Sequence, residues 1–151
     1  MRLLIDADCL IKITRAGFKE QVTQSFTVTA PKPVVAEVLD QGGDRPDARA
    51  IRADVERGAI KVEEDRSVGG DNAIVHVFNT GAFDLVGTDD RRLIRRLTAL
   101  GIPCVMPAVM IYHLVRTGVI ERSNAQEMLA CLAPLVSGEE LQMARFLLEG
   151  S

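Results

Sequence analysis

The sequence has no long hydrophobic run: none of its apolar stretches approaches the roughly 20 residues that a membrane-spanning helix needs. Its first residues also lack the basic start and the extended apolar segment of a secretory signal peptide. These two absences predict a cytoplasmic protein that does not bind membranes.

Cysteine and histidine are scarce. Cys9, Cys104 and Cys131 are odd in number and widely scattered, which argues against a disulfide framework. Neither these cysteines nor the only two histidines, His76 and His113, show the spacing of zinc ligands. The sequence therefore gives no indication of a disulfide-stabilised or zinc-binding domain.

An excess of positive charge is also absent, because 18 Lys and Arg residues stand against 21 Asp and Glu residues. The resulting net charge of −3 excludes a protein that binds nucleic acid through bulk positive charge. It does not exclude an enzyme whose acidic side chains bind metal ions. With 151 residues, 47% of them hydrophobic, the chain is long enough for one domain with a full core.

Short apolar runs alternate with amphipathic segments along the chain. Strands are expected at residues 2–5, 25–29, 59–63, 84–87 and 102–107. Helices are expected within residues 9–16, 34–41, 46–57, 67–81, 88–101, 108–117, 122–133 and 138–149. This alternation predicts a three-layer α/β/α fold, in which a central parallel sheet of about five strands has helices on both faces. We expect one domain over residues 1–151, with a core of about 1–118 and C-terminal helices at about 119–150.

Acidic residues recur at the edge of this predicted sheet where ligands bind, the carboxyl ends of the parallel strands. They are Asp6, Asp8, Glu37, Asp71, Asp89 and Asp90. Taken singly, most of them could be helix caps or solvated helix residues, and Asp8 could cap the helix that follows the first strand. Asp6 is harder to explain in this way, because it ends an apolar strand with no local partner. Together, carboxylates this close would repel one another unless a divalent cation such as Mg²⁺ or Mn²⁺ compensated them.

Four of these acids lie in stretches that resemble the motifs of the PIN domains. The stretches are "LLIDADCLI" with Asp6, "PKPVVAEVLD" with Glu37, "GGDNAIVHVF" with Asp71 and "LVGTDDRRL" with Asp90. The resemblance extends from Met1 to roughly Gly118. PIN domains are small metal-dependent ribonucleases that include the VapC toxins of toxin–antitoxin pairs. This chain departs from many of them by carrying Asp8, where Ser, Thr or Asn is usual.

The resemblance implies hydrolysis of phosphodiester bonds in single-stranded RNA with one or two Mg²⁺ or Mn²⁺ ions. Asp6, Asp71 and Asp90 would be metal ligands, and Glu37 would bind metal through water or orient the nucleophile. Asp8, Thr88 and Asp89 would support these ligands through hydrogen bonds or charge. An antitoxin protein and a second copy of the chain are the expected protein partners.

Basic residues near the acids are candidates for contacts with the RNA backbone. They are Arg91 and Arg92, together with Lys12 and Arg15 on the first helix. The alternative is a solvated helix face on which these arginines pair with Asp89 and Asp90. The opposite face of that helix is predicted to bury Leu93, Ile94, Leu97 and Leu100. Because aromatic residues make up only 4% of the chain, base stacking is expected to be minor.

Two other interpretations remain open at the level of sequence. The first is a small phosphatase of the haloacid dehalogenase type, which "LLIDADCL" and "GTDD" also resemble. There Asp6 would attack phosphorus, Asp8 would be the general acid and Thr29 would bind phosphate. The second is a PIN-like protein that binds a partner without catalysis. His76, which lies among apolar residues, is predicted to pack in the core rather than to take part in chemistry.

Overall fold

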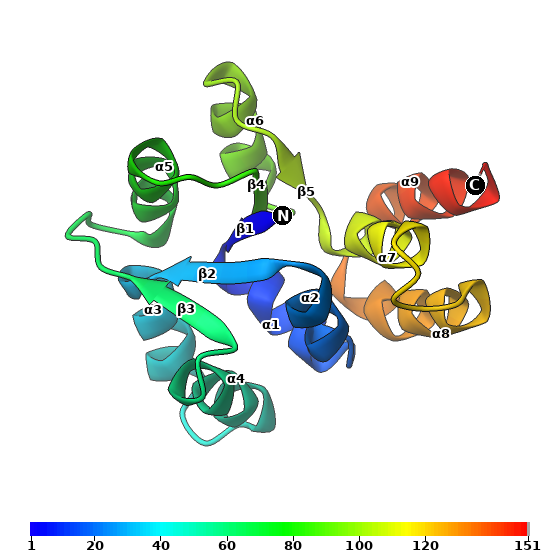
Figure 1. Cartoon of the computed structure of the whole chain (residues 1–151), viewed down its shortest axis with the longest axis horizontal. Coiled ribbons are helices and arrows are strands. Elements are labelled where there is room, and N and C mark those ends of the chain that lie inside the picture. Colours follow the sequence, from blue (N-terminus) through cyan, green and yellow to red (C-terminus); the bar gives the residue numbers. More distant parts are fainter. Residues whose placement is uncertain (151) are drawn as a thin grey trace.

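The computed structural model describes residues 1–150 and is built around a five-stranded parallel sheet (Figure 1). The strands are β1 (Arg2–Ile5), β2 (Thr27–Pro31), β3 (Ile60–Glu63), β4 (Leu85–Gly87) and β5 (Cys104–Val105). Their order in the sheet is β3-β2-β1-β4-β5, with every neighbouring pair parallel. The predicted α/β/α fold with a parallel central sheet is confirmed.

Nine α-helices lie around the sheet in the described part of the chain. They are α1 (Ala7–Arg15), α2 (Lys19–Ser25), α3 (Lys32–Gly42), α4 (Pro46–Glu56), α5 (Gly70–Thr80), α6 (Arg91–Ala99), α7 (Pro107–Arg116), α8 (Arg122–Leu132) and α9 (Gly138–Glu149). Figure 1 shows α5 and α6 on one face of the sheet and α1, α3 and α4 on the other. Helices α7, α8 and α9 pack together at the β5 side, and α8 also contacts α1. Within residues 1–150, every helix is too short or too polar to cross a bilayer.

The central strand β1 explains why the sheet forms where it does. Leu3, Leu4 and Ile5 are fully buried, as expected for a strand covered on both faces in a parallel sheet. β1 pairs with β2 on one side and with β4 on the other. The order of strands along the chain therefore reverses at β1 and β4, and in such sheets this reversal opens a crevice outside the carboxyl ends of the two strands.

Three local predictions are wrong. β2 begins at Thr27 rather than at residue 25, because helix α2, which was not predicted, extends to Ser25. The residues of α2 are mostly polar, and Val22 is its buried apolar residue. Leu100 is 53% exposed, because it is the cap residue after the last turn of α6 and has left the core-facing side. His76 is exposed on α5 and pairs with Asp65 instead of packing in the core.

Candidate active site

A cavity of about 130 Å³ lies at the carboxyl ends of the strands, where the strand order reverses. Its lining residues are Asp6, Ala7, Asp8, Val34, Glu37, Gly70, Asp71 and Asp90. Five of these eight are acidic, and none of the eight is cationic. The four acids of the PIN-like stretches, and Asp8 with them, are therefore brought to one cavity, from the starts of α1, α5 and α6 and from the second turn of α3.

Asp6 is the buried member of this group, with 7% of its surface exposed. One carboxylate oxygen accepts a hydrogen bond from the backbone N–H of Cys9 at 2.8 Å, so Asp6 is the N-cap of α1. The possibility that Asp8 caps this helix is thus wrong, and Asp8 lies exposed in the first turn. The backbone N–H of Asp6 also bonds to the carbonyl of Gly87 at 3.0 Å, which fixes the ends of β1 and β4 together.

Burial raises the pKa of Asp6 from its ordinary value of 3.8 to about 7. The hydrogen bonds from Thr88 and Cys9 act in the opposite direction, because they stabilise the charged carboxylate. The charges of Asp89 and Asp8 add to the rise. A carboxylate that is this costly to ionise favours a nearby cation.

Thr88 connects two of the predicted ligands and is itself fully buried. Its hydroxyl donates a hydrogen bond to the second carboxylate oxygen of Asp6 and accepts one from the backbone N–H of Asp90 at 3.1 Å. Asp90 in turn caps α6, since its Oδ1 accepts from the N–H of Leu93 at 2.9 Å. One buried hydroxyl therefore sets the positions of Asp6 and Asp90 relative to each other.

Asp71 and Glu37 complete the acidic lining of the cavity. Burial raises the pKa of Asp71, and the charge of Asp90 raises it further, while Arg96 and Arg92 oppose the rise. Oε2 of Glu37 lies 3.2 Å from the point where a Cβ on Gly70 would be. The preceding Gly69 has a φ of +86°, a conformation that glycine adopts readily. The two glycines thus let the start of α5 approach the Glu37 carboxylate closely.

Asp89 does not line this cavity but points to a neighbouring one of about 170 Å³. There its carboxylate accepts a hydrogen bond from Lys12 Nζ at 2.7 Å. Glu140 lies beside it, is 3% exposed and accepts from the backbone N–H of Ala108 at 3.0 Å. Burial raises the pKa of Glu140, and the charge of Asp89 raises it further.

Glu140 is the residue of this region that the sequence did not reveal. The only local signal is the Ser137-x-x-Glu140 spacing, which is typical of a helix capping box. Ser137 does accept from the backbone N–H of Glu140 at 3.1 Å. The Glu140 carboxylate, however, reaches the start of α7 instead of its own helix, and this long-range contact leaves no trace in the sequence.

The basic residues predicted to contact RNA have different surroundings. Arg91 pairs with Glu139 at 2.9 Å, and Lys12 pairs with Asp89. Arg92 lies close enough to Asp71 for its charge to oppose the rise in the pKa of that carboxyl. Arg15 is at the far end of α1, where it bonds to Asp47 at 2.9 Å. Of the four, Arg92 beside Asp71 and Lys12 near Asp8 thus lie close to residues of the acidic cavity, and Lys12 is already paired with Asp89.

The carboxylates of the cavity supply hard oxygen donors, which suit Mg²⁺ or Mn²⁺. Each Asp6 oxygen accepts one hydrogen bond and retains a second lone pair. Within residues 1–150, no group of three or more His, Cys, Asp or Glu side chains is arranged so that it could hold a metal ion as it stands. The exposed carboxylates of Glu37, Asp71 and Asp90 would therefore have to turn from the cavity walls towards its centre.

No protein-family model matches the chain, and no curated protein is significantly similar to it in sequence.

Proposed function

We propose that this protein is a metal-dependent endoribonuclease of the PIN type that hydrolyses phosphodiester bonds in single-stranded RNA. The observation that carries the proposal is the cavity at the carboxyl ends of β1 and β4, which five acidic residues and no cationic residue line. The order of the four motif acids along the chain and the parallel sheet support it. The absence of a lysine among the lining residues favours the nuclease over the phosphatase interpretation, in which Asp6 would attack phosphorus.

A bound Mg²⁺ or Mn²⁺ would supply a water of lowered pKa and would neutralise the charge of the scissile phosphate. Asp6, Asp71 and Asp90 are the residues that would hold it. Asp6 is fixed by α1 capping and by Thr88, so it would keep its place while the exposed Asp71 and Asp90 adjust. Relief of the repulsion between Asp71 and Asp90 favours cation binding.

Glu37 is the residue that we assign to orienting the attacking water. It lines the cavity from α3, and its carboxylate lies close to Gly70 at the start of α5. Asp8, which is exposed at the cavity, adds negative charge and accepts hydrogen bonds from water. An RNA phosphate would be repelled by this charge without a cation, and Arg92 beside Asp71 is placed to attract it.

Purified protein incubated with a labelled single-stranded RNA tests the proposal. We expect cleavage with Mg²⁺ or Mn²⁺, none in excess chelator, and loss of cleavage in Asp6→Asn. Asp44→Asn, which removes an exposed acid outside the cavity, is the matched control and should cleave normally. Equal cleavage with and without chelator would refute a metal-dependent mechanism.

An antitoxin partner and a homodimer complete the proposal. Apolar residues of α7 and α8, such as Ile111 and Leu129, are buried in the core and so are not available to a partner. The remaining support is on α9, where Met143 is 49% and Phe146 is 71% exposed. Light scattering on the purified chain measures self-association directly, and a monomeric mass with no co-purifying protein would argue against both partners.

A further inference from the structure

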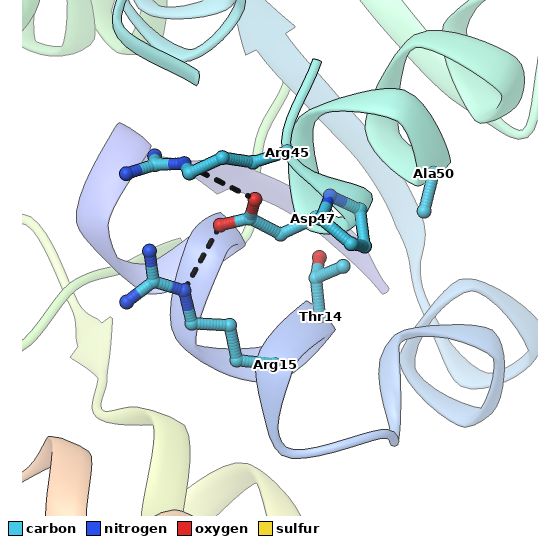
Figure 2. Close-up of a pocket in the computed structure, with 6 residues that line it drawn as sticks. Thr14, Arg15, Arg45, Asp47 and Ala50 are labelled. Atoms are coloured by element: carbon cyan, nitrogen blue, oxygen red, sulfur yellow. Dashed lines mark hydrogen bonds and ion pairs between the residues drawn. The ribbon is translucent and has the colours of Figure 1, made fainter. Parts of the chain in front are cut away.

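A second cavity, of about 510 Å³, lies between α1 and α4 (Figure 2). Its lining residues are Thr14, Arg15, Arg45, Pro46, Asp47 and Ala50. The two arginines share one carboxylate: Arg15 Nε is 2.9 Å from Asp47 Oδ2, and Arg45 Nε is 3.5 Å from Asp47 Oδ1. Figure 2 shows both guanidinium groups on the same side of Asp47. The pair carries a net positive charge, in contrast to the acidic cavity.

Asp47 fixes the orientation of both guanidinium groups. Its side chain is 7% exposed, and its Oδ1 also accepts from the backbone N–H of Ala48 at 2.9 Å. Burial tends to raise the pKa of this carboxyl, but the bonds from Arg15 and Ala48 and the charge of Arg45 bring it below its usual value. Both arginines use Nε towards Asp47, and within residues 1–150 their terminal Nη atoms have no hydrogen-bond partner. Each therefore presents free N–H groups to a ligand.

Helix α1 relates this cavity to the acidic one. Asp8 lines the acidic cavity and Arg15 lines the second, and the two residues are seven positions apart on one face of α1. At a rise of about 1.5 Å per residue, that spacing is about 10 Å along the helix. A stacked nucleic-acid strand advances about 3.4 Å per nucleotide, so roughly three nucleotides would bridge it.

We propose that Arg15 and Arg45 together bind a backbone phosphate of single-stranded RNA, about three nucleotides from the scissile bond. The inference rests on the proposed function and names a part of its substrate-binding surface. Planar guanidinium groups match the geometry of phosphate oxygens. The two guanidinium groups and the Asp47 carboxylate together carry one positive charge, which balances the single negative charge of a phosphodiester. Pro46 and Ala50 give the cavity an apolar wall for a sugar or base.

The test measures binding rather than cleavage. A fluorescently labelled single-stranded RNA of roughly ten nucleotides, within the range of known single-strand site sizes, is titrated in excess chelator by fluorescence anisotropy. The triple variant R15Q/R45Q/D47N removes both arginines without leaving a buried unpaired carboxylate, and it changes the net charge by −1. Arg49→Gln, an exposed arginine on α4, changes the net charge by the same amount and is the control.

We expect the triple variant to bind RNA roughly tenfold more weakly, and Arg49→Gln to stay within about twofold of wild type. The slope of log K against log salt should fall by about 0.7 for each lost phosphate contact. Arg45→Gln, in which Arg15 still pairs with Asp47, should show an intermediate loss without a threat to folding.

The outcomes separate this inference from the proposed nuclease function. Equal RNA affinity in the triple variant and Arg49→Gln would overturn the subsite even if the wild type cleaves RNA. A wild type that does not cleave, but loses RNA binding in the triple variant, would support the subsite and refute the nuclease. Tighter binding of a glutamate-rich peptide than of RNA, with the same dependence on Arg15 and Arg45, would assign the pair to a protein partner and overturn the inference.

Discussion

The hydroxyl of Thr88 donates a hydrogen bond to the buried carboxylate of Asp6, 82 positions earlier in the chain. The same hydroxyl accepts one from the backbone N–H of Asp90. Thr88, the residue after β4, therefore holds in place both Asp6, the N-cap of α1, and Asp90, the N-cap of α6. Because Asp6 and Asp90 are proposed metal ligands, loss of this hydroxyl should affect stability and catalysis together.

Thr88→Val tests this role with a side chain of nearly equal volume. It leaves a buried carboxylate oxygen and a backbone N–H without their partner, which costs about 1–3 kcal/mol for each buried unsatisfied group. We expect a lower urea midpoint and weaker cleavage. Thr88→Ser keeps the hydroxyl and should retain most of both. A valine variant as stable and active as wild type would show that the hydrogen bond does not position the site.

The stability of the protein without divalent cation should fall as pH rises from about 4 to about 7. The folded-state pKa of Asp6 is raised from 3.8 to about 7 by burial, so the folded protein binds more protons than the unfolded chain in that window. The cost of ionising Asp6 is absent below the window and complete above it. Asp6→Asn has no such cost, and its urea midpoint should fall less over the same range.

Comparison of the two proteins isolates this effect, because Glu140, whose pKa is also raised, contributes equally to both. Mn²⁺ should reverse the trend in the wild type, since a bound cation favours the ionised carboxylate. Parallel pH profiles for wild type and Asp6→Asn would mean that Asp6 ionises in the folded protein without penalty.

Asp90→Asn should separate capping from metal binding. Asparagine caps helices about as well as aspartate, so the bond to the N–H of Leu93 can persist. Removal of the charge relieves repulsion on Asp71 that is worth on the order of 1 kcal/mol. Without metal, the variant should melt at the same temperature as wild type or higher.

With Mn²⁺, the wild type should gain about 2.7 kcal/mol at a cation concentration 100 times Kd, and Asp90→Asn should lose most of that gain. Each kcal/mol corresponds to roughly 2–4 °C in Tm for a chain of this size. A variant that melts lower without metal, beside a wild type indifferent to Mn²⁺, would reduce Asp90 to a helix cap.

Gly70→Ala should trade activity for stability. The new Cβ would lie 3.2 Å from Glu37 Oε2, so the carboxylate must move. Gly70 does not have a positive φ, and alanine in place of such a glycine stabilises by about 0.4–1 kcal/mol because it restricts the unfolded chain. We expect cleavage to fall several-fold while Tm stays equal or rises. Glu37→Gln should reduce cleavage further, whereas Asp40→Asn, an exposed acid on the same helix, should not change it.

The sheet and most of the acidic cavity could be predicted because both follow from local pattern. A buried apolar strand followed by Asp6 and a strand followed shortly by Asp90 place both acids at the same edge once the sheet is parallel, and the pairing of β1 with β4 brings them side by side. The sequence could not predict that Asp6 rather than Asp8 caps α1, because this depends on which of the two carboxylates accepts the hydrogen bond from the N–H of Cys9.

Contacts between distant elements account for the other differences. Helix α2 is a short polar segment, so its tertiary setting rather than its periodicity decides its conformation. Glu140 reaches Ala108 and Asp89 from α9, and the pairing of Arg15 with Asp47 joins α1 to α4. None of these partners lies within a helical turn of the other in sequence, and only contacts over such short separations can be predicted from residue patterns.

The contact between Glu140 and Ala108 bears on the order in which the molecule is completed during synthesis. All five acids of the first cavity, the last of them Asp90, leave the ribosome well before α9. Until Glu140 has been synthesised, the backbone N–H of Ala108 in the first turn of α7 lacks the carboxylate that accepts its hydrogen bond. The buried side chains of Leu141, Ala144 and Leu148 are also missing from the core until then. In a nascent chain the acidic residues are thus present before the core around them is complete, and the core is complete only when α9 packs against it.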